Sequence, residues 1–223
     1  MNIAKYIDHT ALKPEATLVH IGQLCNEGKD YGFASVCINP SYIVFARQVL
    51  SGSLVKVCTV IGFPLGANST EVKLFEARCA LADGADELDM VINIGRLKLG
   101  DVQYVKEEIF ALAEIAHANG QVLKVIIETG LLNDDEKRLA CRLAKDAGAD
   151  FVKTSSGFSG GGATIADILL MRATVGPDMG IKASGGIGDY LFAKALIDAG
   201  ATRLGTSKAV TIMQEALTQD MVP

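Results

Sequence analysis

Several features that would indicate export, membrane insertion or a disulfide framework are missing from this chain of 223 residues. No run of about 18 uncharged apolar residues occurs, and the opening residues MNIAKYIDHT lack the apolar stretch of a signal peptide. The five cysteines are scattered, odd in number and form no CxxC pair, which argues against a disulfide framework or a zinc site. We therefore expect a cytoplasmic protein with reduced cysteines.

An excess of positive charge is missing too. The chain carries 21 Lys and Arg residues against 26 Asp and Glu residues, which gives a formal net charge of -5 at pH 7. Such a chain has no general attraction for the phosphates of nucleic acids or for anionic membranes. We therefore expect no nucleic-acid or membrane partner, and any site for an anion must be local.

Fingerprints of metal and nucleotide binding are also absent. The three histidines form no HExxH motif, and no carboxylate-rich metal motif accompanies them, so a metal mechanism is not expected. Neither GxGxxG nor GxxxxGK(S/T) occurs. Because a glycine fingerprint after the first strand usually marks an open, doubly wound sheet, that fold is only the second choice.

What the sequence does contain is a repeated unit of helix and strand. Three phrases, LADGADELDMVIN, KDAGADFVKTSSG and IDAGATRLGTS, each lead from the end of a helix through Gly-Ala into a short strand. A hydrophobic content of 49% over this length allows one large core without a second domain. We therefore expect a single domain that covers residues 1–223.

Strand-like and helix-like segments alternate along the chain. The strand-like runs cover residues 6–10, 33–39, 56–63, 87–93, 123–129, 151–155, 181–185 and 203–207. Amphipathic helical segments include residues 71–85, 101–120 and 134–148. Eight strands, each followed by a helix, predict an α/β fold of the (β/α)8 TIM-barrel type with short loops.

Three charged residues interrupt these apolar strands. Lys153 lies in FVKTSSGF, Lys182 in GIKASGG and Asp89 in ELDMVIN. A barrel strand has no ordinary solvated face except near its end, where barrel enzymes keep their active sites. Because an isolated buried ion is costly, the three residues are expected to share one polar pocket. A buried ion pair that only stabilises the barrel interior, or a lysine at an edge that reaches solvent, would produce the same pattern.

The pair of lysines has a specific chemical use. An amine that is partly desolvated and held near a second cation has a lowered pKa, so a useful fraction is the free, nucleophilic base. Its attack on a carbonyl gives an iminium ion, which withdraws electrons from the adjacent carbon as carbon–carbon bond cleavage requires. Asp89 is then a candidate for moving the protons.

Glycine-rich loops offer a place for an anionic end of a substrate. They are GFSGGGAT (157–164), SGGIGD (184–189) and GTSK (205–208). In a TIM barrel the loops after the last two strands commonly bind phosphate through backbone N–H groups. Gly185, Gly186 and Gly205 would allow close approach of an oxyanion, and Ser207 adds a hydroxyl. Ordinary turn formation would explain the glycines of any one loop, but two such loops at the expected barrel positions favour an anion site.

Other residues are weaker candidates. Asp8 and Thr10 end the first strand and could face the pocket, although Thr10 could equally cap a turn. Cys37 could be a pocket thiol, but a packing role is preferred. Lys124 and Glu128 alternate on one strand face and could complete the polar interior as an ion-pairing shell.

The ordered motifs ELDMVIN, LKVIIETG, FVKTSSGF, GIKASGGI and RLGTS, with IDHTALKP and SVCINP, resemble those of the deoxyribose-phosphate aldolase family. The resemblance spans nearly the whole chain. It implies a class I aldolase on a TIM barrel, which cleaves 2-deoxy-D-ribose 5-phosphate reversibly to D-glyceraldehyde 3-phosphate and acetaldehyde. It also implies no metal or organic cofactor, a role in deoxyribose phosphate catabolism, and assembly as a homodimer or homotetramer.

The resemblance assigns roles residue by residue. It implies that Lys153 forms the Schiff base, that Lys182 perturbs its pKa, and that Asp89 acts with Lys182 in acid–base steps. The implied residues for the substrate and its phosphate are Ser156, Gly157, Gly185, Gly186, Gly205 and Ser207. Two departures from the family pattern are Ser156, where many relatives have threonine, and Lys208, where some have a second serine.

Two other classes of function stay open at this point. A barrel isomerase or epimerase could share the phosphate site and use Asp89 as a base without a covalent intermediate. A protein that binds sugar phosphates without catalysis could use the same glycine loops. The paired strand lysines favour the aldolase over both.

Overall fold

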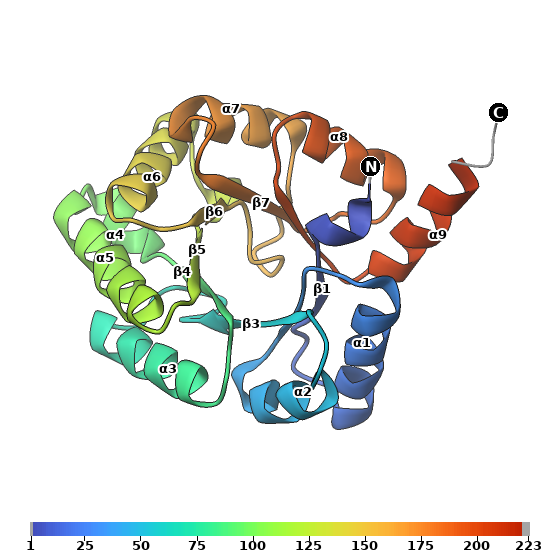
Figure 1. The fold of residues 1–223 in the computed structure, drawn as a ribbon. Helices are drawn as coiled ribbons and strands as arrows, with labels where there is room; N and C mark the ends of the chain where they lie inside the picture. The colour runs from blue at the N-terminus through green and yellow to red at the C-terminus, as the bar shows by residue number, and fades with distance from the viewer. Residues whose placement is uncertain (1, 220–223) are drawn as a thin grey trace.

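The chain folds into a closed barrel of parallel strands, seen in a computed structural model that describes residues 2–219 (Figure 1). Within this range, strands β1 to β8 follow one another in chain order around the barrel, and β8 closes onto β1. Helices surround the strands on the outside. The predicted (β/α)8 barrel is confirmed, and the doubly wound sheet is excluded; residue 1 and residues 220–223 of the predicted domain lie outside the described range.

The strands are β1 (Ile7–Ala11), β2 (Ser35–Ile38), β3 (Lys56–Ile61), β4 (Glu87–Val91), β5 (Val122–Ile126), β6 (Phe151–Lys153), β7 (Gly180–Ser184) and β8 (Arg203–Thr206). The helices are α1 (Leu18–Tyr31), α2 (Ile43–Val49), α3 (Thr70–Ala82), α4 (Ile94–Leu99), α5 (Val102–Ala118), α6 (Asp134–Asp146), α7 (Ile165–Val175), α8 (Tyr190–Asp198) and α9 (Ala209–Gln219). Short 3-10 turns cover Ile3–Tyr6, Pro40–Tyr42 and Thr129–Leu131.

Several strands end earlier than the sequence predicts. The predicted strand 123–129 stops at Ile126, and the predicted strand 151–155 stops at Lys153. Residues just past these points, such as Ile127 and Thr154, are still fully buried, but they already belong to the loops at the carboxyl end of the barrel. Hydrophobic periodicity cannot separate a ladder residue from a buried loop residue that follows it.

Local sequence explains where the helices begin. The side chain of Asn133 accepts a hydrogen bond from the amide of Glu136, whose carboxylate accepts in return from the amide of Asn133, so α6 starts with a capping box. Thr17 and His20 form a similar reciprocal pair at the start of α1. The three Gly-Ala phrases lie between the ends of α3, α6 and α8 and the strands that follow, as predicted.

Alternation along the strands separates two layers. In β4, Leu88 and Met90 belong to the large hydrophobic cluster between strands and helices, whereas Glu87 and Asp89 point into the barrel. The interior of the barrel is therefore charged, and the apolar core lies outside it.

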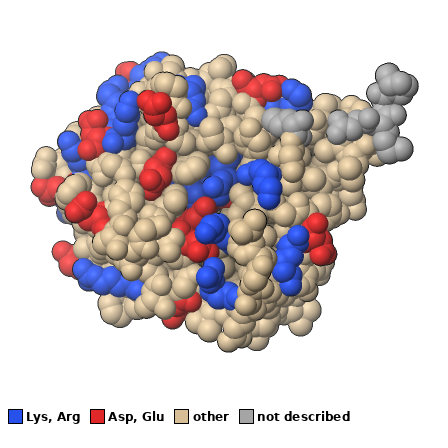
Figure 2. Space-filling view, in the orientation of Figure 1, with Lys and Arg blue, Asp and Glu red and all other residues tan. Residues whose placement is uncertain are grey.

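The face of the molecule drawn in Figure 2 is not dominated by charges of one sign. Figure 2 shows basic and acidic side chains interspersed over that face. Among residues 2–219, none of the helices combines the length and apolar character needed to cross a bilayer.

Candidate active site

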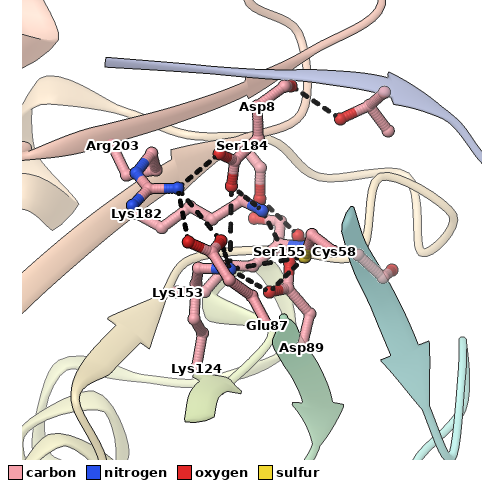
Figure 3. A network of polar contacts seen from close by, with 12 residues as sticks. Asp8, Cys58, Glu87, Asp89, Lys124, Lys153, Ser155, Lys182, Ser184 and Arg203 are labelled. Atoms are coloured by element: carbon pink, nitrogen blue, oxygen red, sulfur yellow. Dashed lines mark hydrogen bonds and ion pairs between the residues drawn. The ribbon is translucent and has the colours of Figure 1, made fainter. Parts of the chain in front are cut away.

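Asp89 is the centre of the charged interior (Figure 3). Its Oδ2 atom accepts hydrogen bonds from Nζ of Lys153 at 2.6 Å and from Nζ of Lys182 at 2.7 Å. Its Oδ1 atom accepts from Lys124 Nζ at 2.9 Å and from the Cys58 thiol at 3.1 Å. The barrel register explains this convergence, because Asp89 is level with Lys124 and Lys153 is level with Lys182. Three residues that the sequence singled out thus meet at one carboxylate.

A second layer of ion pairs lies around this centre. Lys182 also pairs with Asp8, and Lys124 pairs with Glu87 at 2.6 Å. Arg203 links the two carboxylates, with Nη1 at 2.6 Å from Asp8 and at 3.0 Å from Glu87. Lys182, Lys124 and Arg203 therefore each contact at least two carboxylates.

The lysines fix the ionisation of the two buried aspartates. Burial on its own raises the pKa of Asp89, but attraction to Lys124, Lys153 and Lys182 outweighs burial and holds that pKa well below its ordinary value. Burial likewise raises the pKa of Asp8, and Lys182 and Arg203 more than reverse the effect. Both carboxylates are therefore charged at neutral pH.

The same ion pairs keep Lys182 and Lys124 protonated. Burial lowers the pKa of Lys182, but Asp8 and Asp89 together raise it above its ordinary value. The pKa of Lys124 is also raised well above its ordinary value, since Asp89 in particular overcomes the effect of burial. Lys182 is therefore protonated in the resting protein, beside Lys153 in the barrel register.

Charge balance distinguishes Lys153 from the other basic residues. The interior cluster holds the cations Lys124, Lys153, Lys182 and Arg203 and the carboxylates Asp8, Glu87 and Asp89. Lys153 contacts a single carboxylate among the described residues, whereas the other three cations contact two or more. Lys153 is therefore the cation of this cluster that the fewest ion pairs hold in place.

Acid should destabilise the fold through Asp8 and Asp89. Because their folded-state pKa values are depressed, their stabilising effect is present above the unfolded value of about 4 and is lost as pH falls toward the folded values. We expect the free energy of unfolding to fall steeply below about pH 4, by about 1.4 kcal/mol for each unit of depressed pKa. Urea unfolding followed by circular dichroism at several pH values measures this slope.

Asp8→Asn provides the comparison for this prediction. The variant lacks one of the two titrating groups, so its stability should be lower at pH 7 and should change less between pH 5 and pH 3 than that of the wild type. Equal slopes for the two proteins would contradict the assignment of acid sensitivity to this cluster.

Lys153 also borders a cavity of about 920 Å³ at the carboxyl end of the barrel. Most of the residues with a predicted substrate role line the same cavity: Thr10, Lys153, Ser156, Gly157, Gly185, Gly186, Gly205 and Ser207. Lys182 and Asp89 are fully buried in the barrel interior, where Asp89 contacts both Lys153 and Lys182. The cavity thus has an amine at its floor and glycine-rich loops along one wall.

The glycine loops expose free amide groups. The amides of Gly157, Gly185, Gly186 and Ser207 have no hydrogen-bond acceptor within residues 2–219. Gly185 and Gly186 adopt φ values of 88° and 76°, a left-handed conformation that side chains rarely permit. Successive free amides of this kind form a concave site for an anion.

Gly205 has a second role that the sequence did not predict. A Cβ atom at this position would lie 3.0 Å from Cβ of Ser184 and 3.1 Å from Cε of Lys182. The absence of a side chain at Gly205 therefore leaves room for the Lys182 side chain inside the barrel.

The weaker candidates separate into two groups. Asp8 belongs to the interior cluster, while Thr10 lines the cavity and donates its hydroxyl proton to the carbonyl of Asp8. Cys37 is fully buried beside Cys58 in a small cluster, which agrees with the preferred packing role.

The predicted shell of Lys124 and Glu128 is only half present. Lys124 points into the barrel, but the chain leaves the strand before Glu128, whose backbone is left-handed with φ 57° and ψ 66°. The alternation that would place both side chains on one face ends at Ile126. Glu128 instead accepts hydrogen bonds from the Ser156 amide and the Ser159 hydroxyl.

Three residues of the cluster were not identified as site residues: Cys58, Glu87 and Arg203. Glu87 lies two residues before Asp89 in β4, and Arg203 lies two residues before Gly205 in β8. Period-two alternation could have found Glu87 and Arg203. Cys58 depends on the register of β3 against β4, which the sequence does not specify.

Among residues 2–219, two groups of side chains lie close enough together to consider a metal. One consists of Cys37, Cys58 and Asp89, and the other of Asp8, Cys58 and Glu87, with ligand atoms within 4.8 Å of one another in each. The carboxylate oxygens already carry ammonium or guanidinium partners. A cation would have to displace these groups, so the cluster is better suited to amine chemistry than to metal binding.

A TIM barrel with a lysine amine at the floor of its cavity, a second lysine, a shared carboxylate and an anion site has the parts of a class I aldolase. The family model described as DeoC/LacD family aldolase matches residues 2–211. The chain therefore belongs to this family and is an aldolase.

Individual relatives agree with this assignment. A deoxyribose-phosphate aldolase of Thermococcus gammatolerans is 60% identical over 218 residues, covering 97% of both chains. A deoxyribose-phosphate aldolase of Lactococcus lactis is 58% identical over 220 residues, covering 99% of both. The solved structure of deoxyribose phosphate aldolase from Aeropyrum pernix superposes with a TM-score of 0.91 at 38% identity, covering 97% of this chain and 92% of that one.

Proposed function

We propose that the protein cleaves 2-deoxy-D-ribose 5-phosphate reversibly to D-glyceraldehyde 3-phosphate and acetaldehyde through a Schiff base on Lys153. The observation that carries the proposal is the position of Lys153. It combines contact with the cavity, a single carboxylate partner and a second, protonated lysine on the same carboxylate oxygen. These are the conditions under which an amine serves as a nucleophile toward an aldehyde.

The first half of the reaction forms the imine. The free amine of Lys153 attacks C1 of the open-chain sugar, and the Lys182 ammonium donates a proton to the oxygen that leaves as water. The iminium carries the same charge as the original ammonium, so Asp89 can stabilise it without rearrangement of the cluster.

The second half breaks the bond between C2 and C3. Lys182, neutral after its first transfer, takes the proton of the C3 hydroxyl while the bonding electrons move onto C2 to form an enamine. Glyceraldehyde 3-phosphate leaves, and Lys182 passes the proton on to C2, which regenerates the iminium. Water then adds to the iminium and releases acetaldehyde and the Lys153 amine, and the proton set free returns to Lys182. Asp89, which accepts hydrogen bonds from four donors, holds the lysines in place and remains a carboxylate throughout.

The phosphate end of the substrate is assigned to the glycine loops. Free amides of Gly157, Gly185, Gly186 and Ser207 face the cavity from the ends of β6, β7 and β8. Ser207 and Lys208 immediately precede α9, whose N-terminal amides add to the attraction for an anion. Lys208 lines the cavity as an exposed point charge, where it can contribute to phosphate affinity.

Trapping of the imine tests the proposal directly. Borohydride reduction in the presence of acetaldehyde should leave an ethyl group on Lys153, identified by peptide mass spectrometry. Lys98, an exposed lysine paired with Glu136, should remain unmodified and serves as an internal control. Cleavage of the sugar phosphate without any trapped adduct would contradict a covalent mechanism.

The isomerase and binding-protein alternatives receive no support from membership of an aldolase family. An isomerase would also need Asp89 as a base, yet its depressed pKa makes it a weak one. We place the aldolase reaction in cytoplasmic deoxyribose phosphate catabolism. Because the Aeropyrum pernix relative is described as tetrameric, we also propose that this chain assembles as a homo-oligomer, either a dimer or a tetramer.

A further inference from the structure

Glu128 is a strained and fully buried carboxylate with no part in the charged cluster. It has a left-handed backbone, with φ 57° and ψ 66°, and is the one non-glycine residue with positive φ within residues 2–219. A glutamate in this conformation is held there by its surroundings, and such strain is concentrated at functional sites. Its side chain is 0% exposed.

The carboxylate of Glu128 holds one particular loop. A single oxygen, Oε2, accepts hydrogen bonds from the Ser156 amide at 3.1 Å and from the Ser159 hydroxyl at 3.2 Å. Its other oxygen, Oε1, is buried with no partner in the described part of the chain. Both bonds therefore go to the loop of residues 154–164 between β6 and α7, which follows Lys153 directly.

Further contacts join the loop that contains Glu128, residues 127–133, to the loop of residues 154–164. The amide of Thr129 donates to the carbonyl of Thr154 at 2.9 Å. Gly130 and Gly161 face each other so closely that a Cβ atom on Gly130 would lie 3.3 Å from the Gly161 Cα. Farther along, the Ala163 amide donates to the carbonyl of Gly185 in the next loop. Glu128 is thus the polar anchor in a series of contacts that joins its own loop to two loops that line the cavity.

The anchored residue lies next to the free amide of Gly157. The Ser156 hydroxyl accepts from the Phe158 amide at 3.1 Å, so the turn around Gly157 is fixed on one side by Glu128 and on the other by Ser156 itself. With its φ of 86°, this turn directs Gly157 to the cavity wall.

We propose that Glu128 is a positioning residue that holds the loop of residues 154–164 so that the Gly157 amide is preorganised for the phosphate of the substrate. This inference rests on the proposed function. It makes Glu128 a determinant of affinity for the phosphorylated sugar, separate from the formation of the imine on Lys153.

The test compares Glu128→Ala with the wild type on two substrates. For 2-deoxy-D-ribose 5-phosphate, we expect KM to rise about tenfold while kcat changes less than about threefold, because two hydrogen bonds to a buried charged acceptor are lost. For 2-deoxy-D-ribose, which lacks the phosphate, KM should change much less. The rate of borohydride trapping of acetaldehyde on Lys153 should be unchanged.

Three companion variants separate the carboxylate from the backbone strain. Glu128→Gln keeps an oxygen where Oε2 lies, so it should restore KM to within about threefold of the wild type. Ser159→Ala removes one of the two bonds and should give an intermediate KM. Glu128→Gly relieves the strained backbone, so it should unfold at a higher temperature than Glu128→Ala and yet show the same raised KM.

Asp167→Ala serves as the matched control. Asp167 is nearly as buried as Glu128 and pairs with Lys137 at 2.7 Å, a contact that joins α6 and α7 directly after these two loops. Its loss should lower the unfolding temperature without a change in KM.

Hydrogen–deuterium exchange gives a readout that does not depend on turnover. In Glu128→Ala, a peptide covering residues 154–164 should exchange faster, while β6 itself should not. Unchanged exchange of this peptide, or a KM that rises equally for both sugars, would overturn the inference. An inactive wild type would instead contradict the proposed function, and the exchange result would still decide the role of Glu128.

Discussion

Replacement of Lys153 by alanine is expected to lower the rate of sugar-phosphate cleavage by about 10⁴-fold or more, because the variant lacks the amine at the floor of the cavity. The fold should survive. Lys153 has one ion pair, and after its removal Asp89 keeps its bonds to Lys124 and Lys182. Release of glyceraldehyde 3-phosphate in a coupled assay measures the rate, and thermal unfolding measures the stability.

Lys153→Arg refines this prediction. Arginine keeps a positive charge near Asp89, but its guanidinium does not act as a nucleophile at neutral pH. Both variants should therefore be inactive if the role of Lys153 is nucleophilic. Activity in Lys153→Arg but not in Lys153→Ala would show instead that the residue acts as a charge. Lys98→Ala, a change at an exposed ion pair, controls for general effects of lysine removal.

The sequence predicted which residues carry the chemistry of the site better than it predicted the contacts between those residues. Lys153, Lys182 and Asp89 were visible because a charge in a short apolar strand has few explanations. That Lys153 and Lys182 share one oxygen of Asp89 depends on strand register around a closed barrel, which periodicity does not determine.

Glu128 illustrates a different limit. Its place in LKVIIETG predicts an inward-facing strand residue, and a left-handed conformation at a glutamate contradicts every local preference. Only the surrounding loops, through Ser156, Ser159 and the close approach of Gly130 to Gly161, stabilise it. Local conflicts with sequence rules of this kind are expected at functional sites, and they become visible only in the folded chain.

Asp89→Asn should damage stability and catalysis together. The substitution keeps the shape of the side chain but leaves three buried lysines around a neutral amide, so we expect a loss of about 3–5 kcal/mol in the free energy of unfolding at pH 7. The rate of cleavage should fall by about 10³-fold, because the iminium loses its counter-ion and Lys182 loses one of its two carboxylate partners. Urea unfolding and the coupled assay measure the two effects.

Glu108→Gln distinguishes the catalytic effect from the loss of a buried charge. Glu108 and Lys73 form a fully buried pair at 2.9 Å between α5 and α3, outside the barrel interior. The variant should be destabilised and still cleave the sugar phosphate at nearly the wild-type rate. If Glu108→Gln lost as much activity as Asp89→Asn, reduced stability alone would explain both.

The difference in stability between wild type and Asp89→Asn should also depend on pH, with a definite sign. Because the pKa of Asp89 is depressed in the folded protein, its contribution is fully present above about pH 4 and disappears as the carboxyl is protonated. The two proteins should therefore differ most at neutral pH and converge in acid. A difference that stayed constant from pH 7 down to the acid unfolding transition would mean that the introduced amide disturbs packing rather than charge, and the cluster would lose its role as the electrostatic centre of the site.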